Sequence, residues 1–150
     1  MEDREKPSRG VIIFGPVLFI TGSLAALSWF FYRLFDVFFG ELSELKVFDK
    51  GSFYMLGVGV GMLALAIGTV QEYWFGKPLS NKQAAYFTKM ALMSLVLIFT
   101  VPHLIHYCAD NYLLKRGYSV CEEASRQLRL VRDIAYIQPS IECSADLENK

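Results

Sequence analysis

Residues 53–71, FYMLGVGVGMLALAIGTVQ, contain no charged residue. A helix on the surface of a soluble core carries polar residues along one side, and this stretch has no such side. A run of about 20 apolar residues is long enough to cross a hydrocarbon layer of about 30 Å. The stretch therefore predicts a transmembrane helix.

Two further runs have the same character and flank the first one. Residues 11–32 read VIIFGPVLFITGSLAALSWFFY, and residues 90–109 read MALMSLVLIFTVPHLIHYCA. Three such runs predict an all-α membrane protein with three transmembrane helices. We expect a polar N-tail, a three-helix domain and an extramembrane tail over residues 1–10, 11–114 and 115–150, with helices at about 11–35, 53–74 and 84–112.

The extramembrane tail has helical spacing but is too polar to span a membrane. Ser119 is followed three residues later by Glu122, which fits a capping box at the start of a helix. Apolar side chains then recur at helical spacing, at Val120, Ala124, Leu128 and Val131. The pattern predicts an amphipathic helix over about residues 119–134.

Charge sets the expected orientation. The formal net charge is zero, so nothing indicates a nucleic-acid partner. The N-tail carries Arg4, Lys6 and Arg9, against Arg33 beyond the first apolar run. Positive segments tend to stay in the cytoplasm, but the two sides almost balance, since the opposite side carries Lys46, Lys50, Lys115 and Arg116. Because the first helix usually dominates, we expect a cytoplasmic N-terminus and a tail on the opposite side.

The tail also holds two of the three cysteines. A disulfide between Cys121 and Cys143 would stabilise a short extracytoplasmic segment by about 3 kcal/mol. The alternative is two unpaired cytosolic thiols. The tail charges are a candidate recognition surface, or else a solvated face: Glu122, Glu123, Arg126, Arg129 and Arg132.

Small residues form a stripe in the second apolar run, at Gly57, Gly61, Ala64 and Gly68. Their steps of four, three and four place them on one side of a helix. Small residues let membrane helices approach closely. The stripe is interpreted either as internal packing or as a docking face for another membrane helix, from a second copy or a foreign protein.

Ionisable residues gather at one membrane face, because the first helix ends where the third one ends. The expected cluster comprises Arg33, Asp36, His103, His106 and Asp110. Ionisable groups near a membrane suggest a site. Three interpretations remain open: residues that meet water, a partner contact or pH sensor, and a metal or haem site. No nucleophile–base set is evident, so we expect neither an enzyme nor a cofactor.

The segment GYSVCEEASRQLRLVRDIAY, after a three-helix body, resembles an uncharacterised family of small enterobacterial inner-membrane proteins. The resemblance rests on Gly117–Tyr118, Cys121, Glu122–Glu123 and the arginines that follow. Some proteins of this kind are suspected immunity proteins against membrane-targeting toxins. The resemblance implies a binding protein of the bacterial inner membrane with no catalytic residues.

Three hypotheses of function follow. The first is an immunity protein that holds a toxin's membrane segment against the small-residue stripe and recognises its soluble part through a periplasmic tail. The second is an accessory or assembly subunit of a larger membrane complex. The third is a haem- or redox-associated membrane protein. Expected partners are the lipid bilayer and a membrane-inserting protein or complex, and a homo-oligomer is compatible with the stripe.

Overall fold

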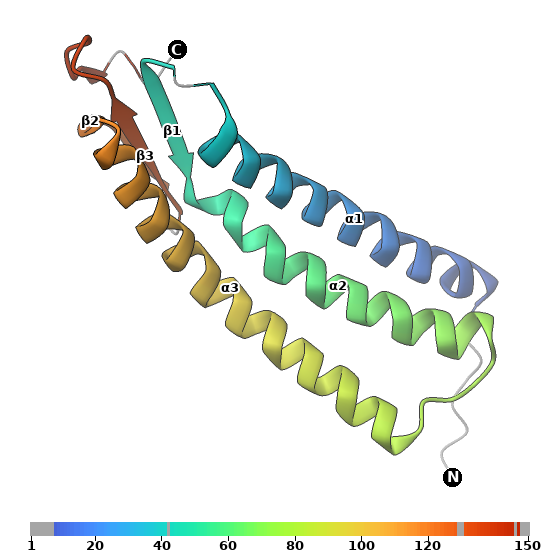
Figure 1. Ribbon diagram of the computed structural model, residues 1–150. Helices are drawn as coiled ribbons and strands as arrows, with labels where there is room; N and C mark the ends of the chain where they lie inside the picture. Colours follow the sequence, from blue (N-terminus) through green and yellow to red (C-terminus); the bar gives the residue numbers. More distant parts are fainter. Residues whose placement is uncertain (1–7, 42, 129–130, 146, 148–150) are drawn as a thin grey trace.

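The chain forms a layer of three long helices with a small β-sheet at one end (Figure 1). The computed structural model describes residues 8–41, 43–128, 131–145 and 147. Most of the predicted N-tail, residues 1–7, therefore lies outside the described residues.

The three predicted membrane helices are confirmed as helices long and apolar enough to cross a bilayer. The spans are Gly10–Phe39, Lys50–Trp74 and Asn81–Lys115. The first lies within α1 (Arg9–Phe39), and the third is α3 (Asn81–Lys115). The second joins a 3₁₀ turn η1 (Lys50–Tyr54), α2 (Met55–Thr69) and a π-helical turn η2 (Val70–Trp74).

Helix α3 begins at Asn81, nine residues before the apolar run at 90–109. The Ser80 side chain accepts a hydrogen bond from the Gln83 N–H, and the Gln83 side chain bonds back to the Ser80 backbone, which makes a capping box. At its other end α3 continues through Lys115, and Gly117 then takes a positive φ of 87° that ends the helical path. The extra turns carry the end of α3 up to the sheet (Figure 1).

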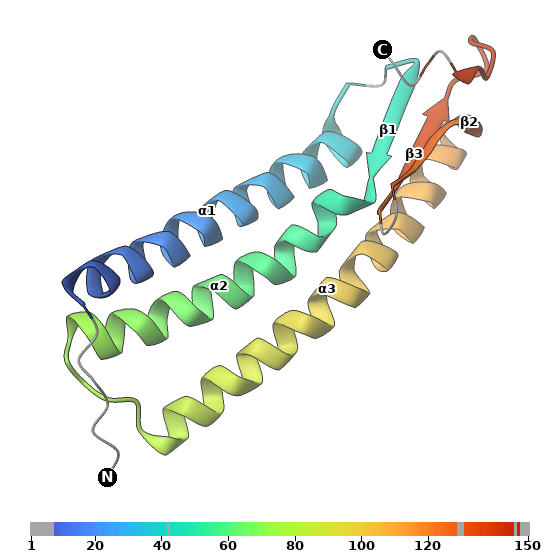
Figure 2. The same ribbon diagram turned by 180° about the vertical axis from the view of Figure 1, so that it is seen from behind.

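Helix α2 lies between the other two helices, and both views show the order α1, α2, α3 across the layer (Figures 1 and 2). A Cβ placed on Gly59 would meet the Leu27 side chain of α1 at 2.7 Å. A Cβ on Gly57 would instead meet the Ser94 backbone oxygen of α3 at 2.6 Å. Since α1 and α3 use opposite sides of α2, the helices form a layer with two open faces.

The predicted amphipathic helix at 119–134 is wrong, because this region forms strands. Strands β1 (Leu45–Asp49), β2 (Ser119–Leu128) and β3 (Val131–Ile137) make an antiparallel sheet in the order β1-β3-β2. Ser119, expected to cap a helix, pairs with Ile137 instead. Strand β1 lies in the first loop, where only a charged connection was expected, and its Phe48 pairs with Ile134.

The physical reason lies in β3, where four consecutive residues are buried. Ile134 and Tyr136 face the helices, whereas Ala135 and Ile137 belong to a second cluster on the outer face. A strand buries alternate residues on two opposite faces, and an amphipathic helix on a surface does not.

Strand β2 contains a long β-bulge. Cys121 pairs with Ala135 and Arg126 with Asp133, so residues 122–125 lie opposite one residue of β3. Within the bulge the Ser125 hydroxyl accepts a 3.1 Å hydrogen bond from the Ala135 N–H and donates one of 2.6 Å to the Cys121 carbonyl. A side chain thus replaces part of the regular ladder.

The main core lies between the sheet and the adjacent ends of the helices. Phe48 of β1 stacks on Phe53 of η1 with ring centroids 4.9 Å apart, and both rings are buried. Phe30 from α1, Leu113 from α3 and Tyr136 from β3 complete the contact between layers. We refer to the sheet and the residues that cover it as the cap.

Candidate functional site

The small-residue stripe of α2 is closed at one end by α3. A Cβ on Gly57 would lie 2.6 Å from the Ser94 backbone oxygen and 2.7 Å from the Ile98 backbone nitrogen. One on Gly61 would lie 3.0 Å from the Ser94 hydroxyl oxygen. For this half of the stripe, the packing interpretation describes the structure.

The other half of the stripe is open. A Cβ on Gly68 would meet nothing within 4 Å. Gly61, Ala64 and Gly68 line a groove between α2 and α3 with a volume of about 230 Å³. Ala91 of α3 lies across this groove, and Phe87 and Leu79 also line it. The stripe therefore runs from a tight helix contact into an unfilled groove.

The chemistry of this groove suits an apolar helix. Its lining carries only two polar side chains, Thr69 and Glu72, at the end farthest from the cap. The Thr69 hydroxyl donates 2.9 Å and 3.0 Å hydrogen bonds to the Leu65 and Ala66 carbonyls. Small residues along the groove would let a second backbone approach α2, as Gly57 lets α3 approach it.

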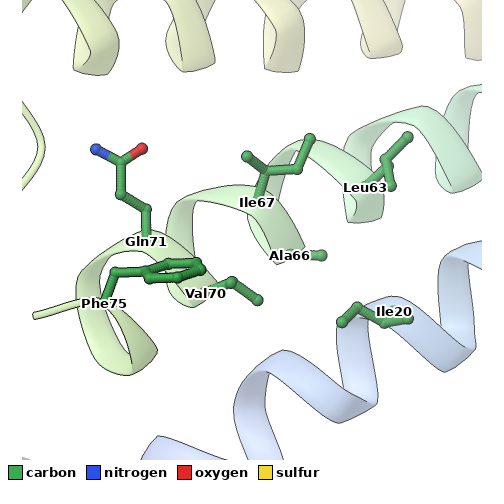
Figure 3. Close-up of a pocket in the computed structure, with 7 residues that line it drawn as sticks. All are labelled: Ile20, Leu63, Ala66, Ile67, Val70, Gln71 and Phe75. Carbon is green, nitrogen blue, oxygen red and sulfur yellow. The ribbon is translucent and has the colours of Figure 1, made fainter. Parts of the chain in front are cut away.

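A second apolar pocket lies between α1 and α2, with a volume of about 300 Å³ (Figure 3). Ile20 of α1 lies across from Ala66 of α2, and the Phe75 ring lies beside Val70 at one end. Leu63 and Ile67 also line it, and Gln71 is its one side chain with a polar group. Such a lining fits a hydrocarbon chain rather than a polar ligand.

The ionisable residues predicted to cluster lie at the end of the helix layer that carries the sheet, in two groups. The first group surrounds Asp36, which pairs with Arg33 at 3.3 Å and with Lys46 at 3.5 Å. Lys46 also donates to the Glu41 carbonyl, and Arg33 to the Val47 carbonyl. These contacts join the end of α1 to β1.

The second group joins α3 to the cap. Nδ1 of His103 lies 3.2 Å from Nζ of Lys50, and the His106 ring lies 5.4 Å from the Phe48 ring. The Tyr136 hydroxyl donates a 3.0 Å hydrogen bond to Asp110. Burial, then this hydrogen bond and the negative charge of Asp110, raises the pKa of Tyr136 above its ordinary 10.0.

The predicted disulfide is present between Cys121 and Cys143, whose Cα atoms are 5.5 Å apart. Of the predicted tail charges, Glu122 and Glu123 are exposed in the bulge of β2. Arg129 lies outside the described residues, as do the side chains of Arg126 and Arg132.

Several residues that hold this region together were missed. Lys46, Lys50 and Tyr136 supply partners for the predicted ionisable residues, and the Tyr118 hydroxyl donates a 2.7 Å hydrogen bond to the Ser43 carbonyl. The available signal was the pair Val47 and Phe48 at 45–49, because β-branched and aromatic residues favour a strand. Within the described residues, no three His, Cys, Asp or Glu side chains are grouped to hold a metal ion.

Comparison with known proteins gives a family but no activity. Neither the curated proteins nor the solved structures include a match to this chain. A family model described as "Protein of unknown function (DUF1240)" matches residues 46–138, which include α2, α3, β2, β3 and all of β1 except Leu45. The chain belongs to this family of proteins of unknown function, DUF1240.

Proposed function

We propose that this protein is a small binding protein of the bacterial inner membrane that docks a transmembrane helix of another protein in the α2–α3 groove. The observation that carries the proposal is that the small-residue stripe of α2 contacts α3 at one end and is uncovered at the other end. Gly57 already holds a helix at backbone contact, whereas Gly68 faces open space on the same side of α2. The groove thus continues an existing helix–helix interface.

The layered arrangement of the helices supports the same proposal. A layer with α2 in the middle exposes both of its faces, since α1 and α3 pack on opposite sides of α2. Without an enclosed interior, the helices offer surfaces for binding and little room for a buried reaction centre.

We place the cap outside the cytoplasm, in the periplasm. Disulfides persist in oxidising compartments, and Cys121 and Cys143 are bridged in the cap. Three crossings then put the N-terminus in the cytoplasm, which agrees with the three basic residues of the N-tail outnumbering Arg33 beyond the first helix. The exposed Glu122 and Glu123 would contribute to partner choice, since charge pairs discriminate between partners more than they add affinity.

The partner we propose is a membrane-inserting toxin, which makes the protein an immunity protein. A toxin helix seated in the groove at its open end, beside Gly68, cannot pack against other toxin helices to form a pore. This mechanism requires differential binding only, with no covalent step.

The test is co-expression with a toxin encoded beside this chain. The variant Gly68→Leu fills the groove, and Gly15→Leu is its matched control. Gly15 is also a membrane-helix glycine around which a Cβ meets nothing within 4 Å, and it lies on α1 away from the groove. We expect wild type and Gly15→Leu to restore growth, and Gly68→Leu to restore it at least about tenfold less, because the leucine side chain occupies the groove.

Equal protection by all three chains would contradict docking in the groove. Failure of the wild-type chain to protect would contradict the immunity role. In that case, crosslinking of a photoreactive side chain at Leu65, which lines the groove, to one subunit of a membrane complex would identify an accessory subunit instead.

A further inference from the structure

The described part of the chain after β3, residues 138–145 and 147, lies across the outer face of the sheet; we call it the strap. Ile141 and Leu147 pack against the outer cluster formed by Cys121, Ala124, Ala135 and Ile137. At the start of the strap the Gln138 N–H donates a 2.9 Å hydrogen bond to the Glu44 carbonyl. Farther along, the bond between Cys121 and Cys143 attaches the strap to β2.

The two ends of this disulfide differ in their surroundings. Cys121 is completely buried, with 0% of its surface exposed, whereas Cys143 is exposed. A disulfide opens when a thiolate attacks one sulfur and the other sulfur leaves, so the exposed end decides where attack occurs. A thiol arriving from solvent therefore has access to the bridge from the exposed Cys143 residue, and none from the buried Cys121 residue.

We propose that Cys143 is a thiol-exchange site and that exchange there with an external dithiol releases the strap from the sheet. One thiolate of the dithiol attacks Sγ of Cys143 and forms a mixed disulfide. The bond to Cys121 breaks, and Sγ of Cys121 leaves with the electron pair and takes a proton from water. The second thiolate of the dithiol then attacks the first sulfur of the dithiol, which is bonded to Sγ of Cys143 in the mixed disulfide. Cys143 leaves and becomes a thiol by taking a proton from water, and the dithiol becomes a cyclic disulfide.

Release is local because the rest of the cap has other supports. The inner face of the sheet is held by the core cluster around Phe48 and Tyr136, and Tyr136 is tied to Asp110. Gln138 anchors the start of the strap on two sides, since its side chain also donates a 3.1 Å hydrogen bond to the Tyr118 hydroxyl. The family match ends at Gln138, the first residue of the strap. Opening uncovers the apolar outer face and two thiols.

The site of exchange is tested on the full chain in membranes, in a Cys108→Ser background that removes the free exposed thiol. The probe is reduced glutathione, a monothiol that has no second thiolate to leave the mixed disulfide by ring closure, with the freed Cys121 thiol trapped by alkylation before peptide mass spectrometry. We expect at least about tenfold more adduct on Cys143 than on Cys121. Equal amounts on both cysteines, or no adduct, would overturn the proposal.

Release of the strap is tested by hydrogen exchange after dithiothreitol and alkylation. Ile141 and Leu147 donate backbone hydrogen bonds within the strap, and we expect their amides to exchange at least about tenfold faster. The amides of Phe48 and Ile134 in the β1–β3 ladder should keep their rates. The variant Cys143→Ser, without reductant, should reproduce the faster exchange of the strap.

Two results would refute the release. If the ladder amides accelerate as much as the strap amides, the bridge merely keeps the cap folded. If the strap amides do not change, Ile141 and Leu147 hold the strap without the bridge.

Discussion

The phenol of Tyr136 and the carboxylate of Asp110 form a 3.0 Å hydrogen bond that ties strand β3 to helix α3. The Tyr136 side chain is fully buried, so this bond lies at the junction between the cap and the helix layer. Such a bond to a charged acceptor contributes about 1.5–3 kcal/mol when its geometry is good.

Replacing Tyr136 by Phe should lower the free energy of unfolding of the cap by about 1–2 kcal/mol at neutral pH, because Asp110 loses a donor. Chemical denaturation in detergent, followed by circular dichroism, measures the change. Tyr107→Phe is the matched control, because Tyr107 is exposed on the same helix. A loss of equal size in both variants would contradict the role of the bond.

The same residue predicts a dependence on alkaline pH. The raised pKa of Tyr136 means that the folded protein holds the phenol proton more tightly than the unfolded chain does. The resulting stabilisation is present below the unfolded pKa of 10.0 and is lost as the pH rises above it. Unfolding curves between pH 8 and 11 should therefore show a steeper loss for wild type than for Tyr136→Phe, by the linkage relation. Parallel curves would contradict this assignment.

Replacing either of two glycines of the stripe by alanine should change the free energy of unfolding in opposite directions. Gly57→Ala places a Cβ within 2.6 Å of the Ser94 backbone oxygen, so α2 and α3 must separate. We expect a loss of about 1–3 kcal/mol from such overpacking. Gly68→Ala meets nothing within 4 Å and should be neutral or gain up to about 1 kcal/mol in helix propensity. Thermal unfolding in one detergent compares them, and equal losses would show that the stripe packs evenly.

Removing the charge of Asp36 should loosen β1 from α1. Asp36→Asn leaves Arg33 and Lys46 without their carboxylate, and only 10% of the Lys46 side chain is exposed. Because Asp36 is partly exposed, solvent screening limits the expected loss to about 1 kcal/mol. The double variant Asp36→Asn with Lys46→Met should recover part of it, which a double-mutant cycle measures. No coupling in that cycle would rule out a role for this pair.

The orientation of the cap can be measured on the cysteines in intact cells, with Cys108→Ser as background. A membrane-impermeant maleimide should label Cys143 only after reduction, because the cysteine is bridged and, as proposed, lies outside the cytoplasm. Labelling only after the membrane is opened would put the cap in the cytoplasm and remove the support for a periplasmic contact.

The helices were predictable from sequence because membrane burial demands a local property, a run of about 20 apolar residues. The sheet was not, because β1 pairs with a strand far along the chain and the local pairing of β2 with β3 is interrupted by a bulge. Phe48 pairs with Ile134 across most of the protein, and the bulge after Cys121 breaks the alternation that marks a strand. In β2 and β3 the spacing of small and apolar residues fitted a helix equally well.

For the candidate site, the sequence indicated which residues belong to it better than it indicated which residues they contact. The bridge between Cys121 and Cys143 followed from their placement in one polar tail, and the structure contains it. The stripe was recognisable, but whether Gly57 or Gly68 meets another helix depends on where α3 leaves α2, which no local pattern specifies. Similarly, the partners of Asp36 and Asp110 come from strands that the pattern did not reveal.

The bulge in β2 has a further consequence for a chain whose three helices are long and apolar enough to cross a bilayer. Strand β2 lies at an edge of the sheet, and a straight edge is a template on which another chain can add a strand. Residues 122–125 depart from the regular ladder, with Ser125 bonding inward to Cys121 and Ala135, and they place Glu122 and Glu123 at the surface. An edge strand with a bulge and negative charges cannot easily pair with the same strand of a neighbouring copy. The bulge in β2 therefore disfavours aggregation through this edge of the sheet.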